Sequence, residues 1–277
     1  MDKEKSSQIA EKIVDKVYDD ALSPAMREVG GIFSAIAGFF NNVVAAPLHR
    51  LNAKHKIKTQ KFIEDLYREY QQIPEENRQE PPVNIVGPTL EALKYNIDED
   101  VLSKLFANLL LSAMDKKRVN KCHPAYVKIL AQMDSSDALV LQHISPRRGS
   151  AFGVVSPRFS IKIEFEGKTF SGYKIMMDKL PDYYIGSVSN LSIFETSKSL
   201  YNLSRLGLIE IQKNSTLRAD FFDPYKDLIN TRDIIDIFNS ADPHILPYCT
   251  LQYDKGCIEF TEFGKDFVEC IVNTKNT

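Results

Sequence analysis

IDEDVLSKLFANLLLSAMDKKRVNKCHPAYVKILAQMDS, residues 97–135, is the most regular stretch of the chain. Between Val101 and Met114 apolar residues recur at steps of three and four, the period of a helix that buries one broad face. Acidic residues at 98–100 lie where the helix dipole favours negative charge, and basic residues at 116–118 follow the helix end. A second helix is expected after His123-Pro124. The stretch therefore predicts a helical core, and no group of its residues indicates an active site.

Two runs within this stretch resemble the signature of a known family. LSKLFANLLLSAMD (102–115) and HPAYVKILAQM (123–133), followed by Asp137-Ala138, are similar to the abortive infection alpha family, as are YDDALSPAMREVG (18–30), LSRLGLI (203–209) and TEFG (261–264). The resemblance covers most of the chain. It implies a bacterial protein of phage defence, and it supplies no catalytic residue. The signature positions to which we assign a structural role are Asn108, Asp115, His123, Pro124, Gly207, Thr261 and Gly264.

The composition is that of an ordinary soluble protein. The chain has 277 residues, of which 43% are hydrophobic and 26% charged, which is enough for two compact domains or one large one. A formal net charge of −2 argues against a surface that binds polyanions throughout. The four cysteines have no CxxC pair and no zinc-like spacing, so we expect free thiols in a reducing cytoplasm. The polar, mixed-charge N-terminus predicts no secretory signal peptide.

No charged residue lies between Val29 and Leu48. In the helix predicted over 29–48, small residues line one face and bulky ones the other, an arrangement that suits close helix packing or membrane binding. The bulky residues are Ile32, Phe33, Ile36, Phe39, Phe40, Val43 and Val44. A basic flank follows, and the contacts we predict with an anionic surface are Arg50, Lys54, Lys56 and Lys58. A buried core helix, an interfacial helix and a spanning helix stay open, although two asparagines and three glycines make the last a poor fit.

No motif indicates catalysis or metal binding. His123 has the residue type of a metal ligand or acid–base group, but no second ligand lies at suitable spacing, so we expect it to hold the start of the 125–133 helix. Asp134 and Asp137 flank a good helix start. Ser136, Asp137 and His143 are too close along one helix for a hydrolase triad. We therefore predict no enzyme activity, no metal and no cofactor.

The C-terminal half predicts a winged-helix arrangement. Strict alternation over 159–165, a turn at 166–168 and apolar residues over 170–175 predict a β-hairpin. A helix over 196–206 ends at Gly207 and is followed by a strand, and later a strand at 257–260 leads into a last helix that Thr261 caps. Residues 213–254 would then form an enlarged wing.

A winged helix suggests DNA binding through the helix before the wing. Its candidate nucleic-acid contacts are Lys198, Asn202 and Arg205. The following insertion carries five aspartates that would repel phosphate, at positions 220, 223, 227, 233 and 236. We therefore favour a protein-interaction surface over a nucleic-acid interface.

The predicted fold class is mainly α with a small β component (α+β). The expected regions are a helical N-terminal region over 1–70, a polar proline-rich connection over 71–88, a central helical core over 89–133 and a winged-helix-like module with a β-hairpin insertion over 134–277.

We predict a non-enzymatic defence protein in the cytoplasm or on the inner face of the cell membrane. Its C-terminal module would sense a phage or host protein, and helix 29–48 would then act on an anionic membrane surface. The alternative is a winged-helix regulator that binds nucleic acid or a protein partner. Both alternatives are compatible with an oligomer.

Overall fold

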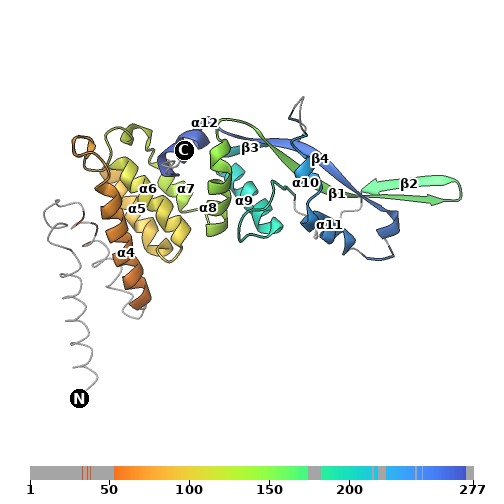
Figure 1. Cartoon of the computed structure of the whole chain (residues 1–277), viewed down its shortest axis with the longest axis horizontal. Helices are drawn as coiled ribbons and strands as arrows, with labels where there is room; N and C mark the ends of the chain where they lie inside the picture. Colours follow the sequence, from red (N-terminus) through yellow and green to blue (C-terminus); the bar gives the residue numbers. More distant parts are fainter. Residues whose placement is uncertain are drawn as a thin grey trace, which may run out of the picture. The chain divides into compact units, whose positions relative to one another are not determined.

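Figure 1 shows the chain as a computed structural model, which describes residues 33, 36, 38, 53–173, 182–213, 215–217, 223–240, 242–244 and 246–272. The chain divides into two compact units, Met1–Ala131 and Gln132–Thr277. The regular elements described in the first unit are helices, and the second unit combines helices with one antiparallel sheet. The predicted α+β class is confirmed.

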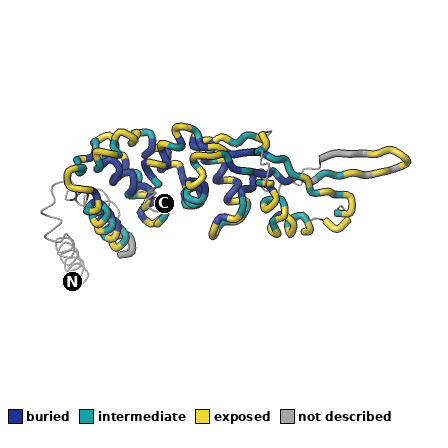
Figure 2. The backbone as a smooth tube through the Cα atoms, turned by 45° about the horizontal axis from the view of Figure 1, so that its top comes forward, coloured by how far each residue is buried: buried dark blue, intermediate teal, exposed yellow. Residues whose placement is uncertain are grey.

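Helix α6, Asp100–Ala113, is the centre of the first unit and corresponds to the helix predicted from the 97–135 stretch. It packs against α4 (Ala53–Tyr70), α5 (Val83–Asn96) and α7 (Ala125–Leu130). Because it meets neighbours on several sides, most of its residues are buried, as Figure 2 shows in dark blue. Its large buried side chains are Leu102, Leu105, Phe106, Leu109, Leu110 and Leu111. Each contributes about 1.5–3 kcal/mol on burial, so α6 supplies much of this unit's stability.

Helix α5 begins at Val83, so the predicted start at Thr89 is wrong. Pro82 precedes the first helical residue, and its carbonyl accepts hydrogen bonds from the amides of Ile85 and Val86. Pro88 lies inside the helix and removes one backbone bond. The helix tolerates this because Asn84, whose carbonyl loses its partner, is exposed to water.

The connection between α4 and α5 is bound to its neighbours along much of its length. It contains a short 3-10 helix, Glu75–Asn77. The Arg78 guanidinium donates hydrogen bonds to the carbonyls of Ile73 (2.9 Å) and Gln71 (3.1 Å) and lies 5.1 Å from the centre of the Tyr70 ring. The backbone amide of Gln79 donates to Met114 O and its side-chain amide to Ala113 O, both at 3.0 Å. The connection thus satisfies carbonyls at the end of α6, which would otherwise lack partners.

The sheet of the second unit has the strand order β2-β1-β4-β3. Its strands are β1 (Phe152–Phe165), β2 (Lys168–Tyr173), β3 (Ile209–Gln212) and β4 (Cys249–Phe260), and all neighbours are antiparallel. The predicted hairpin is present as β1 and β2, joined by Glu166 and Gly167 with φ of 49° and 73°. Positive φ at both turn residues is typical of a type I′ turn. In Figure 1 the hairpin extends beyond the other strands.

Two strands are longer than the sequence predicts. β1 starts at Phe152 instead of 159 and β4 at Cys249 instead of 257, because these extensions pair with each other from Phe152–Ile258 to Ile161–Cys249. The insertion between β3 and β4 therefore spans 213–248 instead of 213–254.

The helices of the second unit are α8 (Ser135–Ile144), α9 (Ile193–Arg205), α10 (Lys226–Ile229), α11 (Arg232–Asn239) and α12 (Glu262–Ile271), with 3-10 turns at Ser145–Arg147 and Leu246–Tyr248. The Asp134–Asp137 pair starts α8 as a capping box, as expected. α9 starts at Ile193 instead of 196, because Ser192 and Glu195 form a second capping box.

Three of the signature residues join the end of α9 to the start of α12. Gly207 has φ of 74°, which ends α9. The Thr261 hydroxyl donates to Gly207 O at 2.6 Å and accepts from the Gly264 amide at 2.8 Å. A Cβ on Gly264 would lie 1.9 Å from Leu208 O, so only glycine fits there. This joint fixes α12 against the start of β3.

The insertion packs on the sheet through a cluster of its own. The fully buried members are Val155, Tyr184, Tyr225 and Ile234. The Tyr225 hydroxyl donates to Gly256 O at 3.0 Å and accepts from the Leu217 amide at 2.8 Å. Ile193 of α9 and Ile237 of α11 pack against the same cluster, which holds both helices in place.

Candidate functional site

The two described bulky residues of segment 29–48, Phe33 and Ile36, are completely buried. The Phe33 ring contacts two tyrosines of α4 edge to face, with centroid distances of 5.3 Å to Tyr67 and 5.2 Å to Tyr70. We call Tyr67 and Tyr70 the tyrosine cradle. The other bulky residues of the predicted membrane or partner helix lie outside the described residues, and these are Ile32, Phe39, Phe40, Val43 and Val44.

One residue of the basic flank has described contacts. Lys58 Nζ lies 2.8 Å from Asp100 Oδ1 and 2.6 Å from the Asp98 carbonyl, at the start of α6. The hydrogen bond to Asp100, with the nearby acidic charges, raises the pKa of Lys58. Arg50 and the side chains of Lys54 and Lys56 lie outside the described residues.

Across the described ranges, no helix has both the length and the apolar character needed to cross a membrane. Most of segment 29–48 lies outside those ranges.

The three candidate nucleic-acid contacts on α9 are bonded to the residues at the start of α8. Lys198 Nζ lies 3.3 Å from Asp134 Oδ2. Asn202 donates to Asp137 Oδ2 at 2.6 Å, and Arg205 donates to Gln132 Oε1 at 3.1 Å. A phosphate contact from any of the three would compete with these bonds.

A buried carboxylate lies at the centre of the α8–α9 contact. Asp137 is 3% exposed, and burial raises the pKa of its carboxyl. Hydrogen bonds from the Asp134 amide (3.0 Å) and from Asn202 oppose the rise in pKa. Within the described ranges, the buried Ser199 hydroxyl beside them makes no hydrogen bond of ordinary geometry. The two helices thus meet through a polar contact, which sequence periodicity did not reveal.

The outward face of α9 carries two exposed aromatic rings, Phe194 (43% exposed) and Tyr201 (45%). The Tyr201 ring lies 4.9 Å from that of Tyr183, and Lys213 Nζ lies 5.3 Å from the centre of the Tyr183 ring. Partial burial and the contact with Tyr183 raise the pKa of Tyr201 to about 12. The seven-residue spacing of Phe194 and Tyr201 places both on one side of a helix, but spacing alone does not indicate that this side is exposed.

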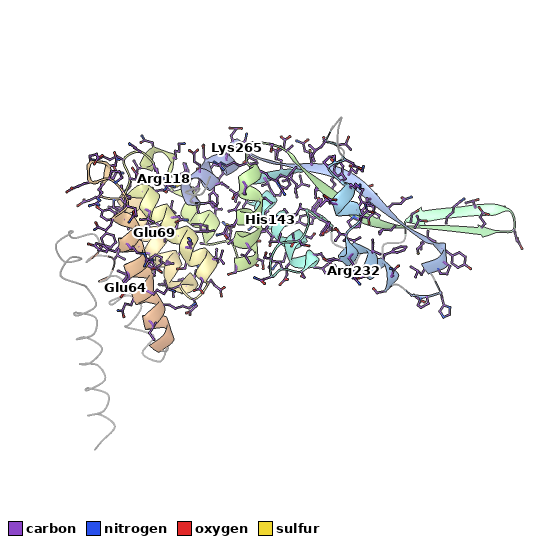
Figure 3. All side chains as sticks on the ribbon, in the orientation of Figure 1. Glu64, Glu69, Arg118, His143, Arg232 and Lys265 are labelled. Atoms are coloured by element: carbon purple, nitrogen blue, oxygen red, sulfur yellow. The ribbon has the colours of Figure 1, made fainter. Side chains whose placement is uncertain are left out.

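His123 and His143 have described surroundings. His123 is exposed, and its Nδ1 accepts a hydrogen bond from the Ala125 amide at 3.1 Å, next to Pro124 at the start of α7. His143, labelled on α8 in Figure 3, is half-buried, and burial together with Arg147 lowers its pKa. Within the described ranges, no group of three or more His, Cys, Asp or Glu residues could hold a metal ion.

The remaining signature residues have structural surroundings. Asn108 is buried in α6. Asp115 follows α6, forms an isolated β-bridge with Arg78, and its Oδ1 accepts from the Lys117 amide at 2.9 Å. Both residues therefore have structural roles in or directly after α6.

Comparisons with known proteins give one family and one solved structure. The model of the family described as "Abortive infection alpha" matches residues 54–271, which is most of the chain. No curated protein matches. An uncharacterized protein from the hydrocarbon-degrading marine bacterium Alcanivorax borkumensis SK2 is similar at 13% identity, over 57% of this chain and 96% of that one, with a TM-score of 0.27. A TM-score this low carries no argument about fold or function.

Proposed function

This chain belongs to the abortive infection alpha family, and its role is therefore one in abortive-infection defence; we propose that it performs this role without catalysis, by releasing its charge-free segment 29–48 onto a membrane. In the resting protein Phe33 of this segment packs against Tyr67 and Tyr70 of α4. A phage or host trigger frees it, and the basic flank brings it to the anionic inner surface of the cell membrane.

The observation that carries the proposal is the complete burial of Phe33 and Ile36, together with the contacts of the Phe33 ring with the tyrosine cradle. Burial of two large apolar side chains stabilises the docked segment by about 3–6 kcal/mol before the entropy of ordering is subtracted. The two edge-to-face contacts add about 0.5–1.5 kcal/mol each. The docked state is therefore favoured at rest, yet a trigger that binds the released state more tightly can overcome a difference of this size.

Charge and composition supply the second part of the argument. Apolar helices with a basic flank bind anionic membrane surfaces, since apolar burial and attraction to lipid phosphates add. From Arg50 to Lys61 the chain carries only basic charges. A membrane mechanism also needs no catalytic residue, and the family resemblance supplied none.

The first test weakens the cradle and leaves the segment intact. Tyr67→Ala removes one aromatic partner of Phe33 at a cost of about 2 kcal/mol, which raises the released fraction about thirtyfold. Flotation with phosphatidylglycerol-containing vesicles is expected to recover much more of this variant than of wild type. Tyr95→Ala, at a 75% exposed tyrosine of α5, is the matched control and should behave as wild type. If folded Tyr67→Ala floats no better than Tyr95→Ala, the proposal is wrong.

The second test addresses the basic flank in the released background. Adding Lys54→Glu and Lys56→Glu to Tyr67→Ala should abolish flotation with anionic vesicles, because two attractive charges become repulsive. Lys58 is left unchanged because it pairs with Asp100 at the start of α6. Vesicles of phosphatidylcholine alone should recover little of either protein. Undiminished flotation of the reversed variant would refute the role assigned to these lysines.

A further inference from the structure

Strand β2 lies at one edge of the sheet in the second unit. In the strand order β2-β1-β4-β3 it pairs with β1 alone among the described strands. Native sheets protect such edges with very short strands, with proline or with a bulge. β3, at the opposite edge, has four residues, whereas β2 has six, contains no proline and keeps an unbroken register with β1 from Lys168 to Tyr173. The outer edge of β2 therefore carries a continuous row of backbone groups to which another strand can bind.

The turn of the hairpin determines which backbone groups of β2 point outward. A two-residue type I′ turn makes its flanking residues, Phe165 and Lys168, a hydrogen-bonded pair. Because hydrogen-bonded and non-hydrogen-bonded pairs alternate in an antiparallel ladder, every second residue of β2 from Lys168 onward bonds to β1. The residues between them, Thr169, Ser171 and Tyr173, direct their amide and carbonyl groups away from β1. We call these three residues the β2 edge.

The outer part of the hairpin consists of two strands. β4 begins opposite Ile161, so residues 162–165 of β1 pair with β2 alone among the described strands. This part extends beyond the other strands in Figure 1. A two-stranded ribbon by itself is marginally stable in water, and additional strands stabilise it. A strand bound to the β2 edge would supply this stabilisation.

We propose that this chain forms a homodimer in which the β2 strands of two copies pair antiparallel across a twofold axis at Ser171. In this register Ser171 lies opposite Ser171 of the second copy, and Thr169 lies opposite Tyr173 of the second copy. The outward amide and carbonyl groups of all three residues then have hydrogen-bond partners. Phe170 lies opposite Gly172 of the second copy, and an aromatic residue across from a glycine is a favourable cross-strand pair.

This self-complementary register is the argument for a second copy as the occupant of the β2 edge. The three outward residues are symmetric about Ser171, so one twofold operation provides partners for all of them. The charged residue of β2, Lys168, lies at one end of the strand, which places the two lysines of the dimer about 20 Å apart. Such an interface buries less than about 1,200 Å², so the dissociation constant is roughly micromolar or higher. The dimer concerns the second unit and does not depend on the membrane proposal.

Cysteine crosslinking of the full chain tests the register. In the dimer the two Ser171 Cα atoms are about 5.5 Å apart, a distance that a disulfide spans. Ser171→Cys should therefore give a covalent dimer under mild oxidation. Thr169→Cys is the matched control on the same exposed edge, and it should crosslink no more than wild type, because its two copies are about 13 Å apart. Adding Tyr173→Cys to Thr169→Cys should produce the covalent dimer again.

Sedimentation velocity over a concentration series, without vesicles, tests the association itself. Wild type is expected to shift to a larger species as concentration rises. Ser171→Pro removes an outward amide donor and leaves the bonds to β1 in place, so it should weaken association by about tenfold or more. Ser171→Ala keeps the amide and should associate as wild type does. Near-UV circular dichroism and the melting temperature establish that the proline variant is folded.

Three outcomes would overturn the inference. One is a wild-type chain that stays monomeric at every concentration. Another is a folded Ser171→Pro variant that associates as strongly as Ser171→Ala. The third is crosslinking of Thr169→Cys as readily as Ser171→Cys, which would show that the copies meet without the proposed register.

Discussion

At the scale of single residues, Gly264 shows why a signature position can be structural. Its Cα lies so close to β3 that a methyl group would come within 1.9 Å of the Leu208 carbonyl oxygen and 2.7 Å of the carbonyl carbon. Neither atom belongs to a flexible side chain. The backbone at the start of β3 would have to move, and the Thr261 bonds to Gly207 and Gly264 would be disturbed with it.

Gly264→Ala is therefore expected to lower the free energy of unfolding by about 3 kcal/mol or more, since overpacking against backbone cannot relax easily. Chemical denaturation of the full chain measures this change. Gly149→Ala is the control, because a Cβ there meets nothing within 4 Å, and it should change stability by less than about 0.5 kcal/mol. Equal effects of the two substitutions would contradict the account of the joint.

The buried carboxyl group of Asp137 leads to a prediction of how the stability of the protein depends on pH. Burial raises its pKa in the folded state above the ordinary value, so the ionised form is disfavoured in the native protein relative to the unfolded chain. The wild type should gain stability from this group as pH falls through the raised native pKa, until the unfolded-state pKa of about 3.9 is reached. At neutral pH the ionised group instead costs stability.

Asp137→Asn is expected to be more stable than wild type at pH 7 and to lose that advantage as pH falls. Asp137 Oδ2 accepts the bonds from both the Asp134 amide and Asn202, so the single side-chain oxygen of asparagine can accept both. Thermal unfolding from pH 7 to 4, compared with Asp266→Asn at an exposed site of α12, measures the difference. A variant less stable than wild type at pH 7 would show that the charge itself stabilises the α8–α9 contact.

At the scale of elements, the connection between α4 and α5 has more structure than its composition indicates. Proline and polar residues predicted an exposed linker, yet Arg78 bonds to two carbonyls and stacks on Tyr70. These contacts join the end of α4 to the segment that satisfies the end of α6.

Arg78→Ala should lower stability by about 2 kcal/mol, since charge-assisted hydrogen bonds and a cation–π contact are lost together. Arg68→Ala is the comparison, because the Arg68 side chain is 70% exposed and forms an exposed ion pair with Asp65, and it should cost less than about 0.5 kcal/mol. Urea denaturation of both variants provides the test. An Arg78→Ala effect no larger than that of Arg68→Ala would mean that the connection contributes little to stability.

Elements with local signals were predictable from the sequence, and those that depend on distant partners were not. Periodicity, or a pair of capping residues three positions apart, is enough to predict four of these features: α6, the Asp134 cap, the β1–β2 hairpin and the Thr261 cap. The extensions of β1 and β4 form because each pairs with the other, across about a hundred residues of chain. The residue types at Lys198, Asn202 and Arg205 suit contacts with nucleic acid. Only the fold reveals that these side chains are bonded to residues at the start of α8. Periodicity likewise marked Phe33 and Ile36 as one face of a helix without indicating which surface would cover them.

At the scale of the whole molecule, membrane action is expected to depend on the first unit, where Phe33 of segment 29–48 contacts the tyrosine cradle.

The membrane mechanism also predicts a phenotype without any phage. Expression of Tyr67→Ala in a bacterial host should reduce viable counts by about tenfold or more relative to wild type, because an increase in the released state of about thirtyfold replaces the trigger. Adding Lys54→Glu and Lys56→Glu should restore growth at equal protein abundance, and Tyr95→Ala should have no effect. A membrane-potential dye should report depolarisation before growth stops. If Tyr67→Ala arrests growth while the potential stays intact, the released segment acts on a target other than the membrane, and the cradle would remain the restraint on a different effector.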